Sequence, residues 1–269
     1  MSQAEVLVVT GYGTNCERET AHAARLAGAD RVTICFFSDL VTERESLEDY
    51  NLIVFPGGFL DGDDLGAAQA AAMRWQYART ASGRSLMQDL KQFHARKKLI
   101  LGICNGFQLL VKLGLLPALN NLYFQRQVSL THNDSARFEN RWVHLSCNPH
   151  SPCVFTRGLD RLFLPVRHGE GKLVCMDDTL QEELMQNNLV ALQYIHPRTG
   201  DPTQEYPHNP NGSPAAIAGL TDPGGSILGL MPHPEAYNHA TNHPAWTRGE
   251  QNILGVELLA RGIEYLRAS

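Results

Sequence analysis

The 269-residue sequence predicts an α/β protein with a mostly parallel central sheet flanked by helices and extra β-structure in its second half. In the first half, runs of Val, Ile and Leu alternate with helical stretches, which is typical of a parallel sheet with crossover helices. In the second half, short apolar segments separated by Gly, Pro and Asn indicate mostly β-structure. No internal repeat or linker interrupts the chain, so residues 1–269 are expected to form a single domain.

The elements of the first half follow from this alternation. Thr14 and Glu17 have the T-x-x-E spacing of a capping box, and Gly28 suits the other end of that helix as a left-handed cap. Residues 66–81, which are rich in alanine, and residues 85–96 supply two further helices. The apolar runs predict parallel strands at residues 6–10, 31–37, 52–55 and 99–103.

The second half contains strands, one long loop and a closing helix. Residues 200–214 are loop by composition, because Gly, Pro and Asn recur through them. Residues 251–266 repeat apolar side chains at helical spacing and are expected to pack back onto the sheet. The strands of this half are predicted at residues 142–145, 162–166, 189–193 and 227–230.

Composition excludes several classes of partner. The formal net charge is -5 and no run of Lys or Arg occurs, so neither nucleic acid nor an anionic membrane surface is an expected partner. No apolar stretch approaches the roughly 20 residues of a membrane helix. The six cysteines never form CxxC and the N-terminus lacks the pattern of a secretory signal. A cytoplasmic protein with reduced thiols is therefore expected.

Cys104 is the first candidate catalytic residue. It directly follows a predicted strand and precedes a predicted helix, and ligands of open parallel sheets bind outside the carboxyl ends of the strands. Gly102 and Gly106 flank it in the G-x-nucleophile-x-G arrangement, which permits a sharp strand-to-helix turn and is expected to push the sulfur into the open. The helix N-terminus favours the thiolate over the thiol. This pattern predicts a nucleophilic cysteine.

His233 and Glu235 are the candidate base and orienting carboxylate. The segment ILGLMPHPEA, residues 227–236, places His233 between two prolines that stiffen its backbone. In an extended segment, residues two apart project to the same side, so the Glu235 carboxylate can reach one ring nitrogen and leave the other for the sulfur. Together with Cys104 this is the nucleophile, base and orienter arrangement of a triad.

Gly57 and Gly58 are candidates for binding an oxyanion. They follow the strand at residues 52–55, and without β-carbons their main-chain N–H groups can closely approach a ligand. Such donors stabilise the negative charge that develops in acyl transfer, typically by about 3 to 4 kcal/mol each. The alternative reading of these two residues is an ordinary tight turn.

These motifs together resemble class I, triad-type glutamine amidotransferases. GICNGFQ around Cys104, FPGGF at 55–59 and MPHPE at 231–235 look like the three signatures of that family, in order. Residues 129–142, 167–171 and 209–220 are similar to the glutaminase subunit or domain of phosphoribosylformylglycinamidine synthase. The likeness runs through nearly the whole chain and implies a flavodoxin-like fold.

The resemblance implies roles for individual residues. Cys104 would attack the side-chain amide of glutamine, His233 would protonate the leaving ammonia, and the thioester on Cys104 would be hydrolysed to glutamate, with Glu235 orienting His233. The oxyanion would be stabilised by the amides of Gly58 and Asn105. The resemblance also implies a glutamine pocket lined by Gln108, His168 and Gly169.

The resemblance also implies partners. The ammonia would pass to a larger synthetase subunit that binds ATP and Mg²⁺ and acts on formylglycinamide ribonucleotide, possibly with a small accessory subunit. This chain is expected to carry none of those sites, and it lacks a G-x-x-x-x-G-K-[ST] loop.

Two departures from the family pattern stand out, Tyr12 in place of Pro and Ala236 in place of a common Arg. The roles of residues 238–250 and of the Ala-rich insertion after Asp61 are not assigned by any signature.

Alternative functions remain open at this level. Another class I amidotransferase is the nearest, and a non-enzymatic regulatory subunit on the same fold is a further one. A metallohydrolase could use His233, Glu235, His239 and His243, since the last two have the i, i+4 spacing that places two ligands on one helical face. A nicotinamide dehydrogenase is disfavoured, because Cys16 replaces the third glycine of G-x-G-x-x-G.

Overall fold

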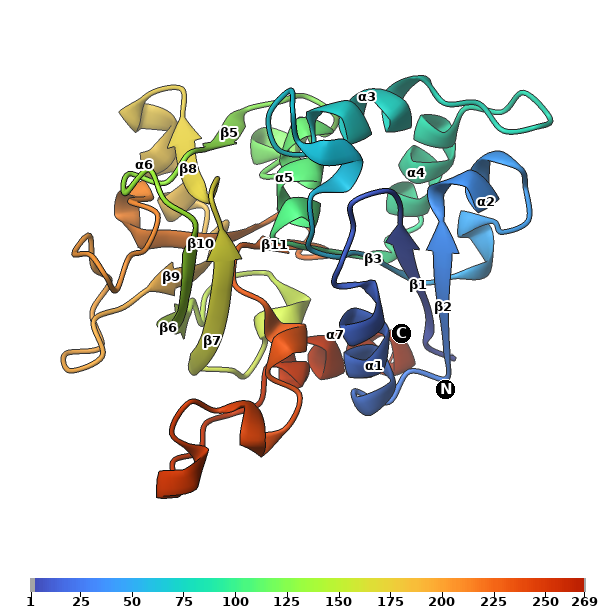
Figure 1. The fold of residues 1–269 in the computed structure, drawn as a ribbon. Helices are drawn as coiled ribbons and strands as arrows, with labels where there is room; N and C mark the ends of the chain where they lie inside the picture. The colour runs from blue at the N-terminus through green and yellow to red at the C-terminus, as the bar shows by residue number, and fades with distance from the viewer. Residues whose placement is uncertain (1–2, 269) are drawn as a thin grey trace.

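The central sheet of the protein has nine strands, with helices on both faces (Figure 1). The computed structural model describes residues 3–268. Its first five strands in spatial order are mutually parallel: β2 (Arg31–Phe36), β1 (Glu5–Thr10), β3 (Leu52–Phe55), β4 (Leu99–Ile103) and β11 (Ile227–Leu230). The other four pair antiparallel: β10 (Ile217–Thr221), β9 (Val190–Tyr194), β6 (Glu139–Cys147) and β7 (Arg161–His168). The predicted α/β fold with added β-structure is confirmed.

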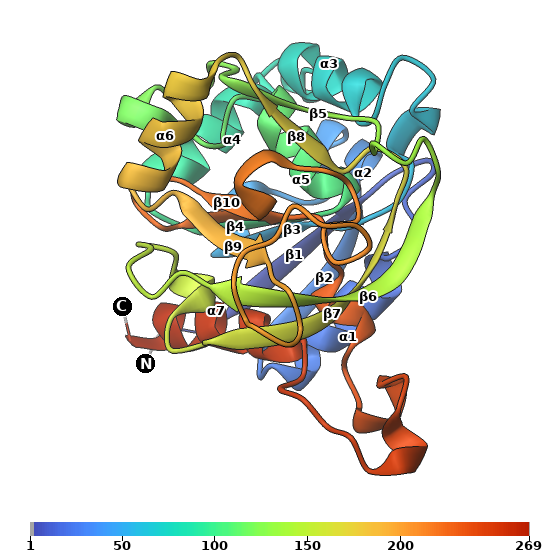
Figure 2. The ribbon, with the colours of Figure 1, turned by 90° about the vertical axis from the view of Figure 1, so that its left-hand side faces the viewer.

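Helices cover the parallel strands from both sides, which Figure 2 shows in a view turned by 90°. The pair α1 (Glu17–Leu26) and α7 (Val256–Ala268) lies on one face. The opposite face carries α3 (Gln69–Tyr77), α4 (Leu86–Ala95) and α5 (Asn105–Lys112). The aliphatic side chains of β3 and β4 are therefore fully enclosed, which explains why these strands read as unbroken apolar runs.

The remaining elements lie around this body. The short helix α2 (Phe37–Val41) follows β2 directly, and α6 (Asp178–Gln186) precedes β9. A separate two-stranded sheet pairs β5 (Val128–Thr131) with β8 (Lys172–Cys175), and β5 packs on α5. In residues 3–268 no helix is long and apolar enough to cross a membrane.

The predicted start of α1 is wrong. The helix begins at Glu17 with Cys16 as its N-cap residue, and no side chain caps it. The hydroxyl of Thr14 instead accepts a hydrogen bond from the Gly11 amide at 3.2 Å, so the predicted capping box does not form. The reason is that Thr14 pairs with Gly58 in an isolated β-bridge, which holds the preceding loop against the loop after β3. Gly28 takes the predicted left-handed conformation, with φ of 94°.

Two other predicted helices are shorter than expected. The Ala-rich helix covers residues 69–77 rather than 66–81, since the Asp63 carboxylate accepts the Ala68 amide at 2.8 Å and shapes the preceding turn. The last helix begins at Val256 rather than at residue 251. Residues 238–254 instead form an arm that projects from the body, red-orange in Figures 1 and 2.

The parallel topology fixes where loops from distant parts of the sequence meet. Because β1, β3, β4 and β11 run in the same direction, their carboxyl ends lie at one edge of the sheet. The segments that follow them, residues 11–16, 56–60, 104–105 and 231–236, therefore converge at that edge.

Candidate active site

Cys104 occupies a sharp turn between β4 and α5. Its backbone is left-handed, with φ of 52° and ψ of -106°, an arrangement that costs energy for a residue with a side chain. The turn needs glycine beside it, since a β-carbon at Gly106 would lie 1.9 Å from the carbonyl oxygen of Phe55. The expectation of an exposed sulfur is wrong, because Cys104 is only 6% exposed. Its thiol lies 3.6 Å from the carbonyl oxygen of Arg167 on β7, the strand at the far end of the sheet order.

His233 and Glu235 are in direct contact. Nδ1 of His233 lies 2.6 Å from Oε1 of Glu235, and the two side chains are 2% and 1% exposed. The prediction that these residues lie in an extended segment is wrong. Residues Pro234–Ala236 instead form a 3-10 turn that bends the carboxylate back to the ring. Nε2 of His233 is buried and has no hydrogen-bond partner among the described residues.

The electrostatics of this pair favour a protonated ring. Burial disfavours the imidazolium and acts to lower the pKa of His233, but the carboxylate of Glu235 and the nearby Cys104 outweigh it. The pKa of His233 therefore lies well above its ordinary value. A histidine in this state holds a proton that it can deliver to a leaving group.

Gly57 is packed against the side chains of Cys16, Cys104 and His233. A β-carbon at this position would lie 2.7 Å from Cε1 of His233 and 3.4 Å from both Cβ of Cys104 and Sγ of Cys16. The structure therefore brings together the predicted residues Cys104, His233 and Gly57 at the carboxyl edge of the sheet. Only glycine leaves room for the ring at this point.

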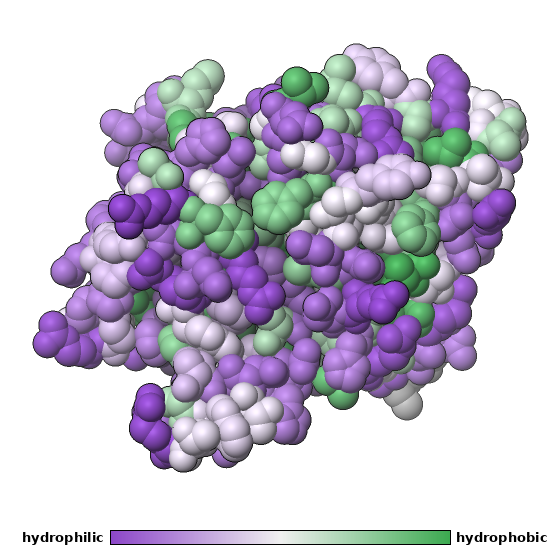
Figure 3. Space-filling view, viewed as in Figure 1, coloured by the Kyte–Doolittle hydropathy of each residue, from purple (hydrophilic) through white to green (hydrophobic). Residues whose placement is uncertain are grey.

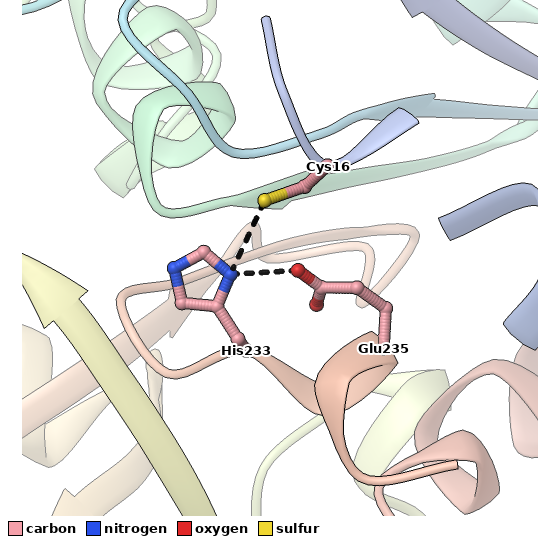
Figure 4. A group of neighbouring side chains, drawn as sticks. All are labelled: Cys16, His233 and Glu235. Atoms are coloured by element: carbon pink, nitrogen blue, oxygen red, sulfur yellow. Dashed lines mark hydrogen bonds and ion pairs between the residues drawn. The ribbon is translucent and has the colours of Figure 1, made fainter. Parts of the chain in front are cut away.

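Cys16 is a site residue that the sequence argument did not assign. Its thiol lies 3.9 Å from Nδ1 of His233 (Figure 4). The same thiol donates a hydrogen bond to Oδ1 of Asn15 at 3.2 Å. Burial raises the pKa of the Cys16 thiol. The backbone amides of Asn15 and Cys16 both approach the carbonyl oxygen of Gly57, at 3.3 Å each, which holds the thiol in place. No sequence signal identifies it, since in the sequence it only occupies the place of the third glycine of G-x-G-x-x-G.

Two cavities meet at Cys104. The first, called here the His233 cavity, has a volume of about 320 Å³ and is lined by Cys16, Glu19, Gly58, Cys104, Arg167 and His233 among others. The second, called the Gln108 cavity, has a volume of about 110 Å³ and is lined by Asp63, Cys104, Gln108, His168, Gly169 and Glu170 among others. Phe59 and Phe138 border both, with ring centroids 6.3 Å apart. Figure 3 shows apolar side chains grouped among polar ones in the middle of this face of the molecule.

Amide side chains organise the wall of the Gln108 cavity. The Asn105 side chain accepts the Leu60 amide at 3.0 Å and donates to Oε1 of Gln108 at 3.0 Å. The same Asn105 amide group also donates to the Asp63 carboxylate, which ties the insertion after Asp61 to the site. Gln108 in turn donates to the carbonyl oxygen of Glu170 at 2.5 Å. Gln108 is therefore held in one orientation beside Cys104.

His168 is buried at the same site without a carboxylate partner. Its Nδ1 lies 3.0 Å from Oδ1 of Asn133, which also accepts the Gly171 amide at 3.0 Å. The Asn133 amide nitrogen donates to the carbonyl oxygen of His168 at 2.8 Å. Because Oδ1 accepts, Nδ1 of His168 carries the proton. Burial, with a smaller contribution from the charge on His233, lowers the pKa of His168 to about 3.

Asn133 and Asn211 support this region and were not predicted as site residues. The amide nitrogen of Asn211, which is fully buried, donates to the carbonyl oxygen of Gly171 at 2.8 Å. Its carbonyl group accepts the Ser213 amide at 3.0 Å. Both asparagines lie in segments that carried the family resemblance, residues 129–142 and 209–220, so the signal was present although no role was attached to it.

The ligand set of the metallohydrolase alternative does not assemble. Nδ1 of His239 is hydrogen-bonded to Oγ1 of Thr241 at 2.8 Å. His243 is buried, and its Nε2 lies 2.9 Å from Oδ1 of Asn252. The segment between the two histidines is a short 3-10 turn, so their i, i+4 spacing does not place them on a helical face. Within residues 3–268, the group of metal-ligating side chains that includes His233 consists of Cys16, His233 and Glu235.

Comparison with known proteins identifies the class of this chain. Residues 3–266 match the model of the CobB/CobQ-like glutamine amidotransferase domain, which covers nearly the whole chain. The chain belongs to this family of glutamine amidotransferases, and within it to the group of phosphoribosylformylglycinamidine synthase subunits PurQ. The dehydrogenase alternative is thereby excluded.

Individual relatives agree with this placement. The chain is 42% identical to the phosphoribosylformylglycinamidine synthase subunit PurQ of Methanococcus maripaludis strain C7, over 90% of this chain and 85% of the relative. It is 40% identical to the same subunit of Dehalococcoides mccartyi, over 91% and 90% of the two chains. Its fold is similar to that of a chain in the structure of PurLQS from Thermotoga maritima, with a TM-score of 0.72 and 28% identity over 98% and 100% of the chains.

Proposed function

We propose that the chain is the glutaminase subunit of phosphoribosylformylglycinamidine synthase in purine biosynthesis. It hydrolyses glutamine to glutamate and ammonia, and the ammonia passes to an ATP-dependent synthetase acting on formylglycinamide ribonucleotide. The observation that carries the proposal is the position of Cys104, which borders both the His233 cavity and the Gln108 cavity. The first cavity supplies the proton-transfer group and the second supplies the pocket for the substrate.

The proposed reaction uses three side chains. Cys104 attacks the side-chain amide carbon of glutamine as the thiolate, and the protonated His233 delivers a proton to the departing ammonia. Water then hydrolyses the thioester and glutamate leaves. Glu235 accepts a hydrogen bond from Nδ1 of His233, which orients the ring and stabilises its positive charge.

The tetrahedral intermediate requires donors for its oxyanion. We assign this role to the main-chain amides of Gly58 and Asn105. Asn105 is the first residue of α5, so its amide lies among those that no intrahelical hydrogen bond uses. The macrodipole of α5 adds to the stabilisation, because its positive end lies at the reacting carbonyl group.

The Gln108 cavity is the proposed glutamine pocket. Gln108, His168 and Gly169 line it, and Arg167 and Glu170 border it with opposite charges. A free amino acid carries both an α-carboxylate and an α-ammonium group, so a pocket with both signs of charge suits it. His168 is neutral, since its pKa is lowered to about 3, and so adds no competing positive charge.

Partners and cofactors follow from the proposed reaction. A larger synthetase subunit and a small accessory subunit are the proposed partners, which is supported by the likeness to a chain of PurLQS. ATP and Mg²⁺ are assigned to the synthetase, and glutamine hydrolysis by Cys104 requires neither. All six cysteines are free, which suits a reducing cytoplasmic location.

Covalent labelling tests the proposal without a partner subunit. A glutamine analogue in which a diazoketone replaces the amide should alkylate Cys104 of the full chain, and glutamine should protect it. Mass spectrometry of the digested protein would locate the adduct. The variant Cys104→Ala should neither be labelled nor release glutamate from glutamine, whether alone or with the synthetase.

The matched control is Cys175→Ala, which removes the most exposed of the other five thiols. Cys175 lines neither cavity. This variant should be labelled as efficiently as the unmodified chain. Labelling of another cysteine, or unchanged glutamate release by Cys104→Ala, would contradict the proposal.

A further inference from the structure

Cys16 and Glu235 approach the same nitrogen of His233. Sγ of Cys16 lies 3.9 Å from Nδ1, and Oε1 of Glu235 lies 2.6 Å from it (Figure 4). The ligand atoms of these three residues all lie within 4.8 Å of one another. The proposed reaction uses the imidazole and the carboxylate and gives no role to the thiol. The Cys16 side chain therefore requires a separate account.

We propose that Cys16, His233 and Glu235 form a binding site for Zn²⁺, in which the ion takes the place of the proton on Nδ1. The donor set of one sulfur, one imidazole nitrogen and one carboxylate oxygen is the chemistry that zinc prefers, and a water molecule would supply the fourth ligand. Zinc bound here breaks the contact between His233 and Glu235. Bound zinc therefore switches off a reaction that needs this pair, a consequence that rests on the proposed function.

The geometry requires a small adjustment of the carboxylate. In a tetrahedral zinc site, nitrogen and oxygen ligands with bonds of about 2.0 to 2.1 Å are about 3.3 Å apart, and a sulfur with a bond of about 2.3 Å lies about 3.6 Å from either of them. The distance from Nδ1 to the Cys16 sulfur is already near that range, whereas Oε1 of Glu235 must move outward. The second oxygen, Oε2, is buried and has no hydrogen-bond partner among the described residues, so it is free to serve as the ligand.

Charge and access also support a cation at this position. Cys16 and His233 line the His233 cavity, whose volume of about 320 Å³ is ample for a hydrated ion to enter. Glu19 on the wall attracts a cation and Arg167 opposes it. The buried carboxylate of Glu235 strongly favours positive charge on the adjacent ring. Binding releases the protons of the Cys16 thiol and of Nδ1, so the affinity for zinc should rise with pH.

The main competing site is the pair of Cys104 and Nε2, the other edge of the same ring. The experiment must separate the two thiols. We would titrate the full chain with Zn²⁺ by calorimetry, and with Co²⁺ by following its thiolate-to-metal absorption band. The unmodified chain and Cys104→Ser should each bind one ion, and their cobalt forms should show the band.

In Cys16→Ser the cobalt band should disappear, and the zinc affinity should fall by about 30-fold or more, since one of the protein ligands is lost. Cys175→Ser is the matched control and should bind as the unmodified chain does. Circular dichroism and the melting temperature would establish that each variant folds. If Cys16→Ser does not fold, Glu235→Gln decides, and it should weaken binding.

A band that survives in Cys16→Ser and disappears in Cys104→Ser would overturn the proposal, as would equal zinc affinities in all of the variants. Because these titrations contain no glutamine, their outcome is independent of the labelling experiment on Cys104. Failure of one proposal therefore leaves the other intact.

Discussion

The two cavities that meet at Cys104 contain equally buried histidines in opposite states. His233 and His168 are each 2% exposed. A carboxylate lies 2.6 Å from Nδ1 of His233, whereas an amide oxygen lies 3.0 Å from Nδ1 of His168. The pKa of the first is raised well above its ordinary value and that of the second is lowered to about 3. The charge of the nearest partner, and not burial, therefore decides which histidine ring is positively charged.

This contrast suggests that the two cavities have different roles in the proposed reaction. The His233 cavity holds charged groups whose protons can move, and the Gln108 cavity holds amides whose hydrogen bonds fix positions. The proposed reaction needs both, because a proton must be transferred while the substrate carbonyl stays aligned with the sulfur of Cys104. Variants that alter one partner in each cavity can therefore separate the two contributions.

The largest effect is expected from Glu235→Gln. The substitution keeps the size of the side chain but removes the charge that holds His233 protonated and oriented, so kcat should fall by roughly 10³-fold or more. Glutaminase assays of the complex with the synthetase would measure it. The exposed Glu264, substituted in the same way, is the matched control and should leave kcat unchanged. A loss of less than tenfold would show that the carboxylate is not needed for the proton transfer.

A smaller effect is expected when the partner of His168 is removed. Asn133→Ala deletes an amide that bonds His168, Gly171 and the Arg137 carbonyl, and it leaves buried groups unpaired. The free energy of unfolding should fall by about 3 kcal/mol. Urea unfolding measures this loss. Asn187→Ala, which removes an exposed hydrogen bond from the Asn187 side chain to the Glu183 carbonyl oxygen at the end of α6, should cost much less, and equal losses would contradict the structural role of Asn133.

The sequence predicted the parallel core and the residues at its edge for a definite reason. Strands covered on both faces are continuously apolar, so β3, β4 and β11 were recognisable, and parallel order brings their following loops together. Local pattern could not supply the depth of burial of Cys104, because residues of other loops and of β7 cover it. The role of Cys16 was equally inaccessible, since its contact with His233 spans most of the chain.

The same limit explains the wrong details. The T-x-x-E pattern at Thr14 and Glu17 is a local signal, and a long-range bridge from Thr14 to Gly58 overrides it. The spacing of His239 and His243 places them on a shared face only if the backbone is helical. The backbone between them is a short 3-10 turn, so this local pattern also misleads. Contacts between distant segments decided each case.

The free energy of unfolding should depend on pH through His168. The unfolded chain protonates His168 near pH 6.5, but the folded chain does not do so until about pH 3, so folding becomes less favourable as pH falls between these values. Within that window this group lowers the free energy of unfolding by about 1.4 kcal/mol for each pH unit of acidification. Above pH 6.5 it causes no such loss. His168→Asn retains a donor at the position of Nδ1 but cannot titrate.

The measurement is the free energy of unfolding by urea at several values of pH from 7 to 5. Other groups titrate in both proteins, so the quantity of interest is the difference between the two slopes. His168→Asn should lose less stability than the unmodified chain on acidification. Parallel slopes would mean that His168 is protonated in the folded protein, and the contrast with His233 would then fail.

The smallest effect is expected at the boundary that the cavities share. Phe138 is 54% exposed and borders both cavities beside Phe59, so it covers the entrance without holding a fixed hydrogen bond. Phe138→Leu keeps an apolar group there and removes part of its area, so KM for glutamine should rise about two- to threefold, equivalent to about 0.5 kcal/mol, with kcat unchanged. Tyr77→Leu alters a comparably exposed aromatic residue on α3 and should leave both constants unchanged. A fall in kcat instead would mean that the ring helps to align the reacting groups, and the division between proton transfer and positioning would extend to the rim of the site.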